Sequence, residues 1–456
     1  MPDQATTAPA VLRFELPYGV VEPAVVNPDA GLARLTVRRS ACYRMDVTIL
    51  DTPDNRLLRA GVVLAHRIVD ELGEWYLAAP DWAPRLPEET TERVGAAADL
   101  PEDFAIAIRP FRRLAPVGPI AALGCERAEY TLRHTSGEPL ATIRDDQVTV
   151  RRGGLTTNRY RECTVWCLPH LTDDQRDLIV EAMLASSASQ VDEFGSLQTR
   201  LGAPATGRSD FPEPQPLARD CDLEHFVQHL CADHLRELVE ADLDLRSGDG
   251  GPERLVDALR SVWVDVRGLA PVLDPAWRSD LEADLAPLTQ LDAGSGSLPL
   301  LGSRLFAVID ALVAASRAPK LGDLSTHEAA PVLRQRIHAG TLILADRCAG
   351  LDASSPDAQW AGAIASAEQL RVTSVVTGTL LPKLAGRFIK RLDKLTAALS
   401  RCVAGPDADL AGLSVREAFE AGRRAERHAA DVRQARKRFI TSWPREAAKL
   451  RKLADS

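Results

Sequence analysis

The stretch Val47–Arg67, VTILDTPDNRLLRAGVVLAHR, indicates how the first half of the chain folds. Two apolar runs, Val47–Leu50 and Gly61–Leu64, are separated by the polar residues Asp51–Asn55. Proline presets φ at a turn position, and Asp and Asn side chains bind nearby backbone groups, so these residues predict a turn. The residues that follow are expected to form one helical turn, which glycine ends before the second strand. We therefore predict two strands joined by a turn and a short helix.

Further strands are predicted throughout the first half, because apolar and polar residues alternate between turn-forming clusters. The expected strands are residues 11–16, 34–37, 47–50, 62–67, 74–78, 121–133, 140–144, 147–150 and 161–168. The pair Asp145-Asp146 is among the clusters that are expected to be turns. Helical segments are expected at residues 172–184 and 189–201. This spacing predicts an antiparallel sheet that closes, or nearly closes, into a β-barrel.

The chain changes character after residues 202–216, which are rich in Gly, Pro and Ser and are expected to be a linker. Beyond it the apolar residues follow a helical period, and Pro and Gly mark several helix boundaries. The expected helices are residues 222–245, 252–269, 275–290, 303–318, 329–349, 356–385, 387–404, 414–441 and 444–454. The predicted fold class is α+β: an N-terminal antiparallel β-barrel domain (residues 1–201) followed by an all-α helical-bundle domain (residues 217–456).

The composition is typical of a globular protein, with 45% hydrophobic and 26% charged residues among 456. No apolar run approaches the ~20 residues that span a bilayer, so no membrane partner is expected. The first residues lack the basic and apolar regions of a signal peptide. The eight cysteines form no CxxC pair, which argues against a disulfide framework and favours a reducing cytosol. We therefore expect a cytoplasmic protein, and its richness in Ala and Arg is typical of a high-GC bacterium.

Charge is unevenly distributed along the chain, whose formal net charge is −9. Residues 371–456 contain 19 Lys or Arg and 9 Asp or Glu, so this block carries +10 and residues 1–370 carry −19. A basic block on an acidic chain can mark contact with a polyanion. The alternative is a solvated helix face that the rest of the molecule neutralises, and the sequence leaves both interpretations open.

Three stretches resemble the CYTH family of triphosphate-tunnel proteins. Residues 47–67 resemble its YFDTPDLRLLRAGVTLRRR signature, residues 119–133 (PIAALGCERAEYTLR) its PVARLRTRRTVYRL strand, and residues 145–168 its DDRVTA…WREVEVEL segment. The resemblance covers nearly all of residues 10–170 and implies a triphosphate-tunnel-like barrel. In this family Arg and Lys hold a triphosphate, and glutamates hold Mg²⁺ or Mn²⁺, hard cations that take oxygen ligands.

Only part of the tunnel chemistry that the resemblance implies is present. The ExExK signature retains only Glu15, and the three carboxylates of the REVEVEL strand are reduced to Glu162. Family positions for Lys, Arg or a carboxylate are occupied by Pro17, Ala78, Gly124, Thr164 and Trp166. The resemblance thus leaves Glu15 and Glu162 as candidate ligands of Mg²⁺ or Mn²⁺, which is a weak pair. The candidate phosphate ligands on this half are Arg67, Arg127 and Arg161, whose alternative role is to pair with nearby Asp and Glu.

The helical half resembles the CHAD domain, which follows a CYTH domain in CYTH–CHAD proteins. The clearest match is residues 269–288, LAPVLDPAWRSDLEADLAPL, beside the family's FRPLLDPAWADPLRAELRWL. CHAD domains are associated with inorganic polyphosphate. The resemblance therefore implies electrostatic and strongly salt-dependent binding of that anion.

Basic residues from two CHAD-like signatures are further candidate phosphate ligands. The first signature falls on residues 252–267 and the second on residues 415–429, and each has lost its histidine. The arginines that we take as candidates are Arg260, Arg267, Arg423, Arg424 and Arg427. Arg424 and Arg427 have a helical spacing that lets them share a face. A charged, solvated face is the alternative interpretation.

A different metal site is suggested by the first expected helix, where Cys221, His225, His229 and Asp233 recur every four residues. Two histidines at i and i+4 can bind a transition metal from one helix face. Surface histidines on an amphipathic helix are common, so a purely structural role is the alternative. The chain contains no Walker loop, GxGxxG motif or nucleophile elbow.

The sequence supports three hypotheses for function. The first is a non-catalytic CYTH–CHAD-like protein that binds inorganic polyphosphate or another phosphate-rich anion. The second is a residual Mg- or Mn-dependent inorganic triphosphatase that uses Glu15 and Glu162 with Arg67, Arg127 and Arg161. The third is a protein–protein scaffold without a phosphate ligand. Specific nucleic-acid binding is not expected.

Overall fold

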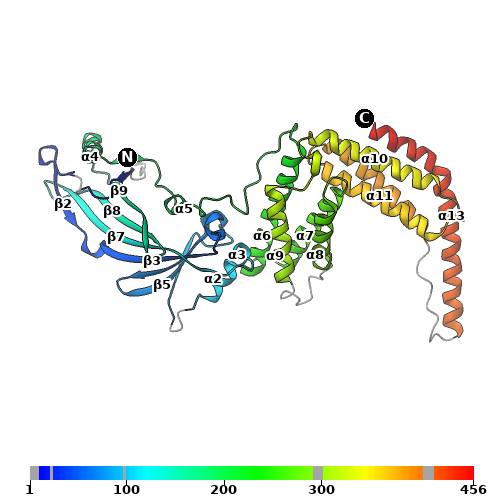
Figure 1. The fold of residues 1–456 in the computed structure, drawn as a ribbon, viewed down its shortest axis with the longest axis horizontal. Coiled ribbons are helices and arrows are strands. Elements are labelled where there is room, and N and C mark those ends of the chain that lie inside the picture. Colours follow the sequence, from blue (N-terminus) through cyan, green and yellow to red (C-terminus); the bar gives the residue numbers. More distant parts are fainter. Residues whose placement is uncertain (1–9, 21–23, 96–98, 291–300, 404–414, 456) are drawn as a thin grey trace, which may run out of the picture. The chain divides into compact units, whose positions relative to one another are not determined.

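The computed structural model describes residues 10–20, 24–95, 99–290, 301–403 and 415–455. The chain divides into two compact units, Met1–Asp210 and Phe211–Ser456, which we call the sheet unit and the helical unit. The boundary between them falls inside the stretch 202–216. Figure 1 shows strands in the first unit and helices in the second.

The sheet unit contains a ten-stranded sheet in which every pair of neighbours is antiparallel. Its strands are β1 (Val11–Leu16), β2 (Leu32–Val37), β3 (Tyr43–Asp51), β4 (Val63–Val69), β5 (Leu72–Ala78), β6 (Glu89–Arg93), β7 (Gly118–His134), β8 (Pro139–Arg152), β9 (Leu155–Cys167) and β10 (Ser189–Val191). They follow the order β10-β1-β9-β8-β7-β3-β4-β5-β6, with β2 paired to β7. Within the described residues no pairing joins β10 to β6, so the sheet is open there. The predicted fold class, an antiparallel β domain followed by an all-α domain, is confirmed.

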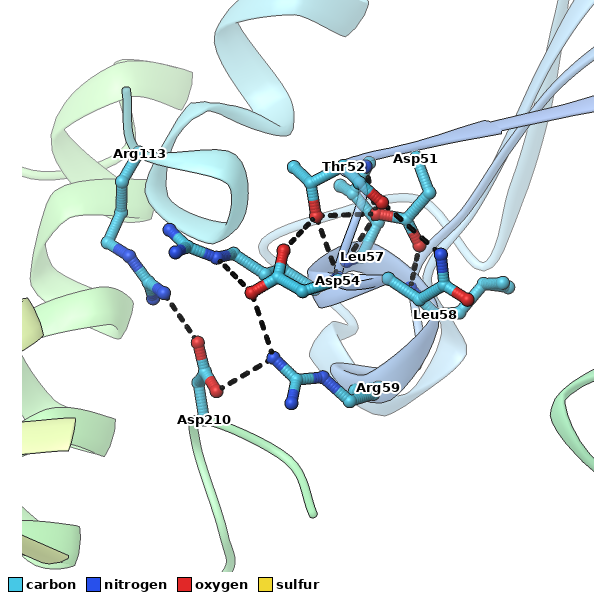
Figure 2. Close-up of polar contacts among 10 residues, drawn as sticks. Asp51, Thr52, Asp54, Leu57, Leu58, Arg59, Arg113 and Asp210 are labelled. Carbon is cyan, nitrogen blue, oxygen red and sulfur yellow. Dashed lines mark hydrogen bonds and ion pairs between the residues drawn. The ribbon is translucent and has the colours of Figure 1, made fainter. Parts of the chain in front are cut away.

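The turn between β3 and β4 is held by the side chain of Asp51, which is 1% exposed. Its carboxylate accepts hydrogen bonds from the backbone amides of Thr52 (2.6 Å), Leu57 (2.9 Å) and Leu58 (2.9 Å). Figure 2 shows these bonds converging on the short helix α1 (Arg56–Arg59). The first amides of a helix have no partner within it, so the carboxylate satisfies groups that would otherwise be unpaired. The helical turn predicted between the two strands is confirmed.

Asp210 attaches the last residues of the sheet unit to this turn region. Its carboxylate accepts hydrogen bonds from Arg59 at 3.2 Å and Arg113 at 2.5 Å, as Figure 2 shows. The Arg113 and Asp210 side chains are almost fully buried. Breaking a buried ion pair is costly, because the remaining charge is left without a partner. The chain is therefore fixed to the sheet unit as far as residue 210.

β8 is one continuous strand, although the sequence predicted two strands with a turn at Asp145-Asp146. That prediction was wrong, because each carboxylate has an arginine on its own face of the sheet. Asp145 pairs with Arg161 at 2.6 Å, and Asp146 pairs with Arg127 at 2.6 Å. A buried carboxylate is tolerated in a strand when it is paired and hydrogen-bonded.

The two faces of the sheet are covered by different helices. On one face Phe14 shares a hydrophobic core with Ile179 of α4 (Asp173–Ala185). On the other, Ile49 shares a core with Leu201 of α5 (Leu197–Leu201). Successive residues of a strand point to opposite faces, so register assigns every strand residue to one of them. We call the second of these faces the α5 face. The remaining helices of the unit are α2 (Glu102–Ala107) and α3 (Arg109–Arg112).

The helix expected over residues 189–201 is replaced by β10 and α5. Ser189–Val191 pair with Arg13–Glu15 of β1. The backbone groups on the outer edge of β1 need partners, and β10 supplies them, which explains the strand.

The described residues of the helical unit form helices, as predicted. They are α6 (Leu223–Ser247), α7 (Pro252–Gly268), α8 (Pro275–Thr289), α9 (Leu301–Arg317), α10 (Ala329–Ala349), α11 (Asp357–Thr377), α12 (Pro382–Ser400) and α13 (Val415–Ala454). Trp360, Phe388 and Phe439 belong to one hydrophobic core, which holds α10, α11, α12 and α13 together. None of the described helices is long and apolar enough to cross a membrane.

Two helix boundaries differ from the prediction. The helix expected over residues 356–385 is two helices, because Gly378 ends α11 and Pro382 begins α12. Conversely, α13 continues through Pro444, where two helices were expected; Ser414, the expected start of the first, lies outside the described residues. An interior proline costs about 3 kcal/mol, and burial of Trp443 beside it and Leu450 after it offsets this cost. Figure 1 shows that α13 changes direction along its length, as helices with an interior proline do.

Candidate functional site

The first candidate site is a row of polar residues that crosses five neighbouring strands on the α5 face. Glu15 of β1 lies opposite Glu162 of β9, and Glu162 lies opposite Asp146 of β8. Asp146 lies opposite Arg127 of β7, which lies opposite Tyr43 of β3. The register thus places three carboxylates on adjacent strands. Directly opposed like charges destabilise a sheet unless a cation lies between them.

That cation is Arg200, which reaches the row from α5. Its Nη2 donates hydrogen bonds to Oε1 of Glu15 and to Oε1 of Glu162, the latter at 3.0 Å. Its guanidinium also lies over the Tyr160 ring, with 4.5 Å between Cζ and the ring centroid. Burial raises the pKa of Glu162 above its usual range, and the Arg200 charge opposes that rise. The two candidate metal ligands are therefore brought together, with an arginine of the same chain between them.

Arg127 is held at the other end of the row by its neighbours. Its Nε and Nη2 donate to the two oxygens of Asp146 at 2.6 and 2.8 Å, and its Nη1 donates to the Tyr43 hydroxyl at 2.6 Å. Arg144 approaches the same carboxylate at 3.5 Å and lies over the Trp166 ring at 4.8 Å. Bidentate pairing occupies the geometry with which a guanidinium would bind phosphate.

Arg67 lies on the α5 face but outside this row. It is opposite Glu74 in the register, and its Nη1 lies 3.8 Å from the Glu74 carboxylate and 3.7 Å from that of Glu89. Its guanidinium packs on the Tyr76 ring. Arg67 is thus neutralised by two carboxylates of the same sheet.

Arg161 lies on the opposite face of the sheet from the other candidates. Its Nε and Nη2 bind the two oxygens of Asp145 at 2.8 and 2.6 Å, and its Nη1 donates to the Val20 carbonyl at 2.6 Å. The residue is 2% exposed. The structure therefore does not bring Arg161 together with Arg67 and Arg127, and its guanidinium is fully engaged.

The α5 face does not fit the Mg²⁺ or Mn²⁺ that the family resemblance implies. The position between Glu15 and Glu162 is occupied by the Arg200 guanidinium, and Asp146 is engaged by Arg127. Among the described residues, no group of three or more His, Cys, Asp or Glu side chains is arranged to hold a metal ion. That includes the histidines of α6, where His225 instead hydrogen-bonds Asp222 at 2.7 Å.

The second candidate site is a groove of about 530 Å³ between α12 and α13, which we call the α12–α13 groove. Cationic and aromatic side chains make up most of its lining. The lining residues are Arg387, Lys390, Arg391, Lys394, Leu395, Ala398, Phe439, Ser442, Trp443, Glu446 and Lys449. Five of these carry positive charge and one carries negative charge, so the groove is strongly cationic.

Glu446 neutralises only part of the groove. Its carboxylate lies 2.6 Å from Lys449 Nζ and 3.7 Å from Arg391 Nη1. Arg387, Lys390 and Lys394 are exposed, and no acidic side chain of the described residues forms an ion pair with them. These three charges are available to a ligand.

The cationic surface continues beyond the groove at the start of α12. An adjoining hollow of about 670 Å³ shares Arg387 with the groove and adds Arg219, Arg334 and Lys383. On α12, Lys383 precedes Arg387 and Lys390 follows it, so positive charge lies on both sides of Arg387. The cationic lining of the two hollows therefore meets at Arg387.

The arginines predicted from the CHAD-like signatures lie outside the α12–α13 groove. Arg260 pairs with Asp257 at 3.0 Å and lines a hollow that also contains Asp233, Glu237 and Asp265. Arg267 lines a different hollow with Trp263 and Glu368. The structure therefore places these two arginines beside acidic residues, in separate hollows.

Arg423, Arg424 and Arg427 lie on the first half of α13, and all three are exposed. Arg423 lies 5.9 Å from the centroid of the exposed Phe419 ring, and Arg427 Nε donates to the Arg423 carbonyl at 3.2 Å. Their role as phosphate ligands stays a prediction. Further along the helix, Arg436 binds the carbonyls of Cys402 and Ser355 and therefore has a structural role.

Sequence reasoning missed Arg200 and the cations of α12. Arg200 lies 38 residues after Glu162 and in a separate element, so no strand pattern links the two. The α12 cations did leave a signal. Arg387, Lys390, Arg391 and Lys394 are spaced i, i+3, i+4 and i+7, which places them on one helix face.

The chain is similar to the uncharacterized proteins MT2285 and Rv2226, from two strains of Mycobacterium tuberculosis. Each is 23% identical over an alignment of 335 residues and matches 68% of this chain. The chain spans 63% of the length of these curated relatives. The matched region is longer than either unit, so it extends across the boundary between them. No family model matches the chain.

Three solved structures resemble part of the chain. A candidate adenylate cyclase from Bacillus halodurans is 16% identical, covers 37% of this chain and 96% of its own, and has a TM-score of 0.24. One from Vibrio parahaemolyticus is 14% identical, with 43% and 98% coverage and a TM-score of 0.22. A candidate adenylyl cyclase from Hippeastrum, described as having a dominant triphosphatase activity, is 12% identical, with 41% and 92% coverage and a TM-score of 0.22. Each likeness concerns less than half of this chain.

Proposed function

We propose that the helical unit binds a phosphate-rich anion, and long-chain inorganic polyphosphate in particular, in the α12–α13 groove. The observation that carries the proposal is the lining of this groove, with five cations against one carboxylate. The resemblance of the helical half to CHAD domains supports the choice of polyphosphate over other polyanions.

The charges in the groove suit a chain of phosphates better than a single one. Residues of a helix rise about 1.5 Å each, so the cations from Lys383 to Lys394 extend over about 16 Å of α12. Successive phosphates can neutralise successive cations, and each neutralised phosphate releases counterions. Affinity should therefore increase with chain length and fall steeply with salt.

In the same proposal, the sheet unit keeps a CYTH-like scaffold but does not cleave triphosphate. The support is the pairing of its arginines with carboxylates of its own chain, at Arg67 and Arg127. A triphosphate on Arg127 would have to displace the Asp146 carboxylate, whose side chain is only 12% exposed and would lose its bidentate partner. The described residues of this face therefore give the metal-dependent triphosphatase hypothesis no geometric support.

The test is a titration of the full-length protein with fluorescently labelled long-chain polyphosphate at several salt concentrations. The variant Lys390→Glu/Lys394→Glu reverses two exposed charges of the groove. We expect it to lower the affinity at least about tenfold and to reduce the slope of log K against log salt, because about two phosphate contacts are lost.

The matched control is Arg304→Glu/Lys320→Glu, which changes the net charge equally at exposed residues outside the groove. An equal loss of affinity in both variants would show that net charge, rather than the groove, attracts the anion. Unlabelled tripolyphosphate and unlabelled long-chain polyphosphate can be compared as competitors at equal molar concentrations. Equal competition by the two would contradict the extended site. A loss confined to an Arg423→Glu/Arg424→Glu variant would move the site to the first half of α13.

A further inference from the structure

We infer that Arg200 takes the place of a divalent cation between Glu15 and Glu162, so that residues 196–210 close the α5 face and leave it without a metal. The inference concerns the sheet unit alone. It uses residues that the α12–α13 groove does not contain, so it stands or falls separately from anion binding by the helical unit.

The charges of the polar row explain why a cation is needed at this position. Glu15 and Glu162 face each other across paired strands, and Asp146 is the next carboxylate in the row. Arg127 compensates Asp146, so the remaining pair of carboxylates would repel each other. Arg200 binds both through one nitrogen, with its side chain 15% exposed. It supplies the bridging charge that a metal ion supplies in a two-carboxylate site.

The backbone around Arg200 is held in place, which keeps its side chain aimed at the carboxylates. The Asn158 side-chain amide donates to the Arg200 carbonyl at 2.9 Å, and the Gln198 side chain donates to the Leu58 carbonyl at 3.1 Å. Ser196 caps the N-terminus of α5 by accepting from the Thr199 amide at 3.2 Å. These bonds tie α5 to strands and loops of the sheet unit.

The segment after α5 is attached to the same unit. Leu201 and Ala205 are buried in the hydrophobic core of the α5 face, and Arg152 Nη1 donates to the Ala203 carbonyl at 2.9 Å. Asp210 then forms the buried ion pairs with Arg59 and Arg113. Residues 196–210 are thus fixed at both ends and in the middle. These contacts hold the segment permanently against the sheet, whereas a lid would have to detach from it.

A metal ion would have to remove Arg200 to bind. Moving the guanidinium away would leave it without its two carboxylates and would uncover Tyr160 and the neighbouring apolar core. Both effects act against Mg²⁺ and Mn²⁺ at this position.

The test measures Mn²⁺ binding to the full-length protein by electron paramagnetic resonance, alongside the shift in melting temperature on adding Mn²⁺ or Mg²⁺. For the wild type we expect no bound Mn²⁺ that depends on Glu162. Arg200→Ala is expected to gain Mn²⁺ affinity by about tenfold or more, because the competing cation is removed. Adding Glu162→Gln to that variant should abolish the gain. Arg200→Lys keeps a cation in place and should stay without metal.

Arg159→Ala is the matched control, because Arg159 lies over the Tyr18 ring and contacts neither glutamate. Wild-type Mn²⁺ binding that Glu162→Gln abolishes would overturn the inference, and this measurement needs no arginine variant. A folded Arg200→Ala protein that gains no Mn²⁺ affinity would also overturn it. Polyphosphate binding measured on the same variants should be unchanged. The inference about Arg200 and the proposal that the helical unit binds polyphosphate can therefore be rejected independently of each other.

Discussion

At the scale of single residues, Asp51 makes the most testable contribution to the fold. Its carboxylate is the partner of three backbone amides, all within the turn that joins β3 to β4. Asp51→Ala leaves these buried donors unpaired, and each unpaired donor costs about 1–3 kcal/mol. We expect the variant to lose about 3 kcal/mol of the free energy of unfolding of the sheet unit, with accelerated hydrogen exchange at residues 47–67.

Asp54→Ala is the matched control, because Asp54 lies in the same turn but is about half exposed and pairs mainly with Arg56. Exposed ion pairs contribute at most about 1 kcal/mol, so this variant should remain close to the wild type. Equal destabilisation by the two substitutions would contradict the role given to Asp51.

Individual residues also show why part of the site was predictable. Glu15, Glu162 and Arg127 were found because family-like strands place them at fixed positions of period two. Asp146 was assigned to a turn, since a sequence shows two adjacent carboxylates but not their separate partners. Arg161 was grouped with Arg127, although strand register puts the two on opposite faces. Partners across strands decide such cases, and a single sequence does not contain them.

At the scale of elements, α13 depends on aromatic packing around its interior proline. Phe439 stacks on Trp443 with 5.6 Å between ring centroids, and it meets Trp360 of α11 edge to face at 5.5 Å. Phe439→Ala removes both contacts and leaves a cavity in the core of the helical unit. We expect a loss of about 3–5 kcal/mol in the free energy of unfolding, measured by urea denaturation.

The control for this prediction is Phe419→Ala, at a residue of the same helix that is 65% exposed. Surface substitutions usually change stability by less than about 0.5 kcal/mol. A large effect at Phe419 would show that the first half of α13 is covered by a partner rather than by solvent. Such a result would favour the protein–protein scaffold hypothesis.

The elements also show what local sequence can and cannot decide. Turn chemistry and alternation were sufficient for the strands around residues 47–67, because each local preference agrees with the fold. The helix expected at 189–201 is not formed at its start, because β10 pairs there with the edge of β1. The sheet, and not the local sequence, sets this requirement. At Pro444 the sequence predicted a break, but α13 continues through it, because tertiary packing overrides a helix-breaking residue. Distant partners decided both outcomes.

At the scale of the whole molecule, buried thiols limit stability in alkali. All eight cysteines are free thiols. Burial raises the pKa of Cys163 in the sheet unit and of Cys348 in the helical unit, each to about 12. A raised pKa means that the folded protein keeps a proton that the unfolded chain loses. The stabilising contribution is therefore complete below the ordinary thiol pKa, near 9, and is lost as the pH rises towards 12.

We expect the free energy of unfolding to fall between pH 8 and pH 10 by about 1 kcal/mol for each such thiol, measured from urea midpoints. Cys348→Ala should reduce the fall by that amount, after allowance for the cavity that it creates at both pH values. A pH dependence identical to that of the wild type would show that the Cys348 thiol titrates normally in the folded protein.

Arg200 has one more consequence, which concerns competition. A group tethered to its own site has an effective concentration on the order of millimolar even when the tether is flexible, and residues 196–210 are folded against the sheet. A free metal ion competes with Arg200 only at its concentration in solution. Dilution lowers that concentration, but it does not lower the effective concentration of the tethered guanidinium. Chelators, dialysis and growth in metal-poor medium should therefore leave the sheet unit as stable as before.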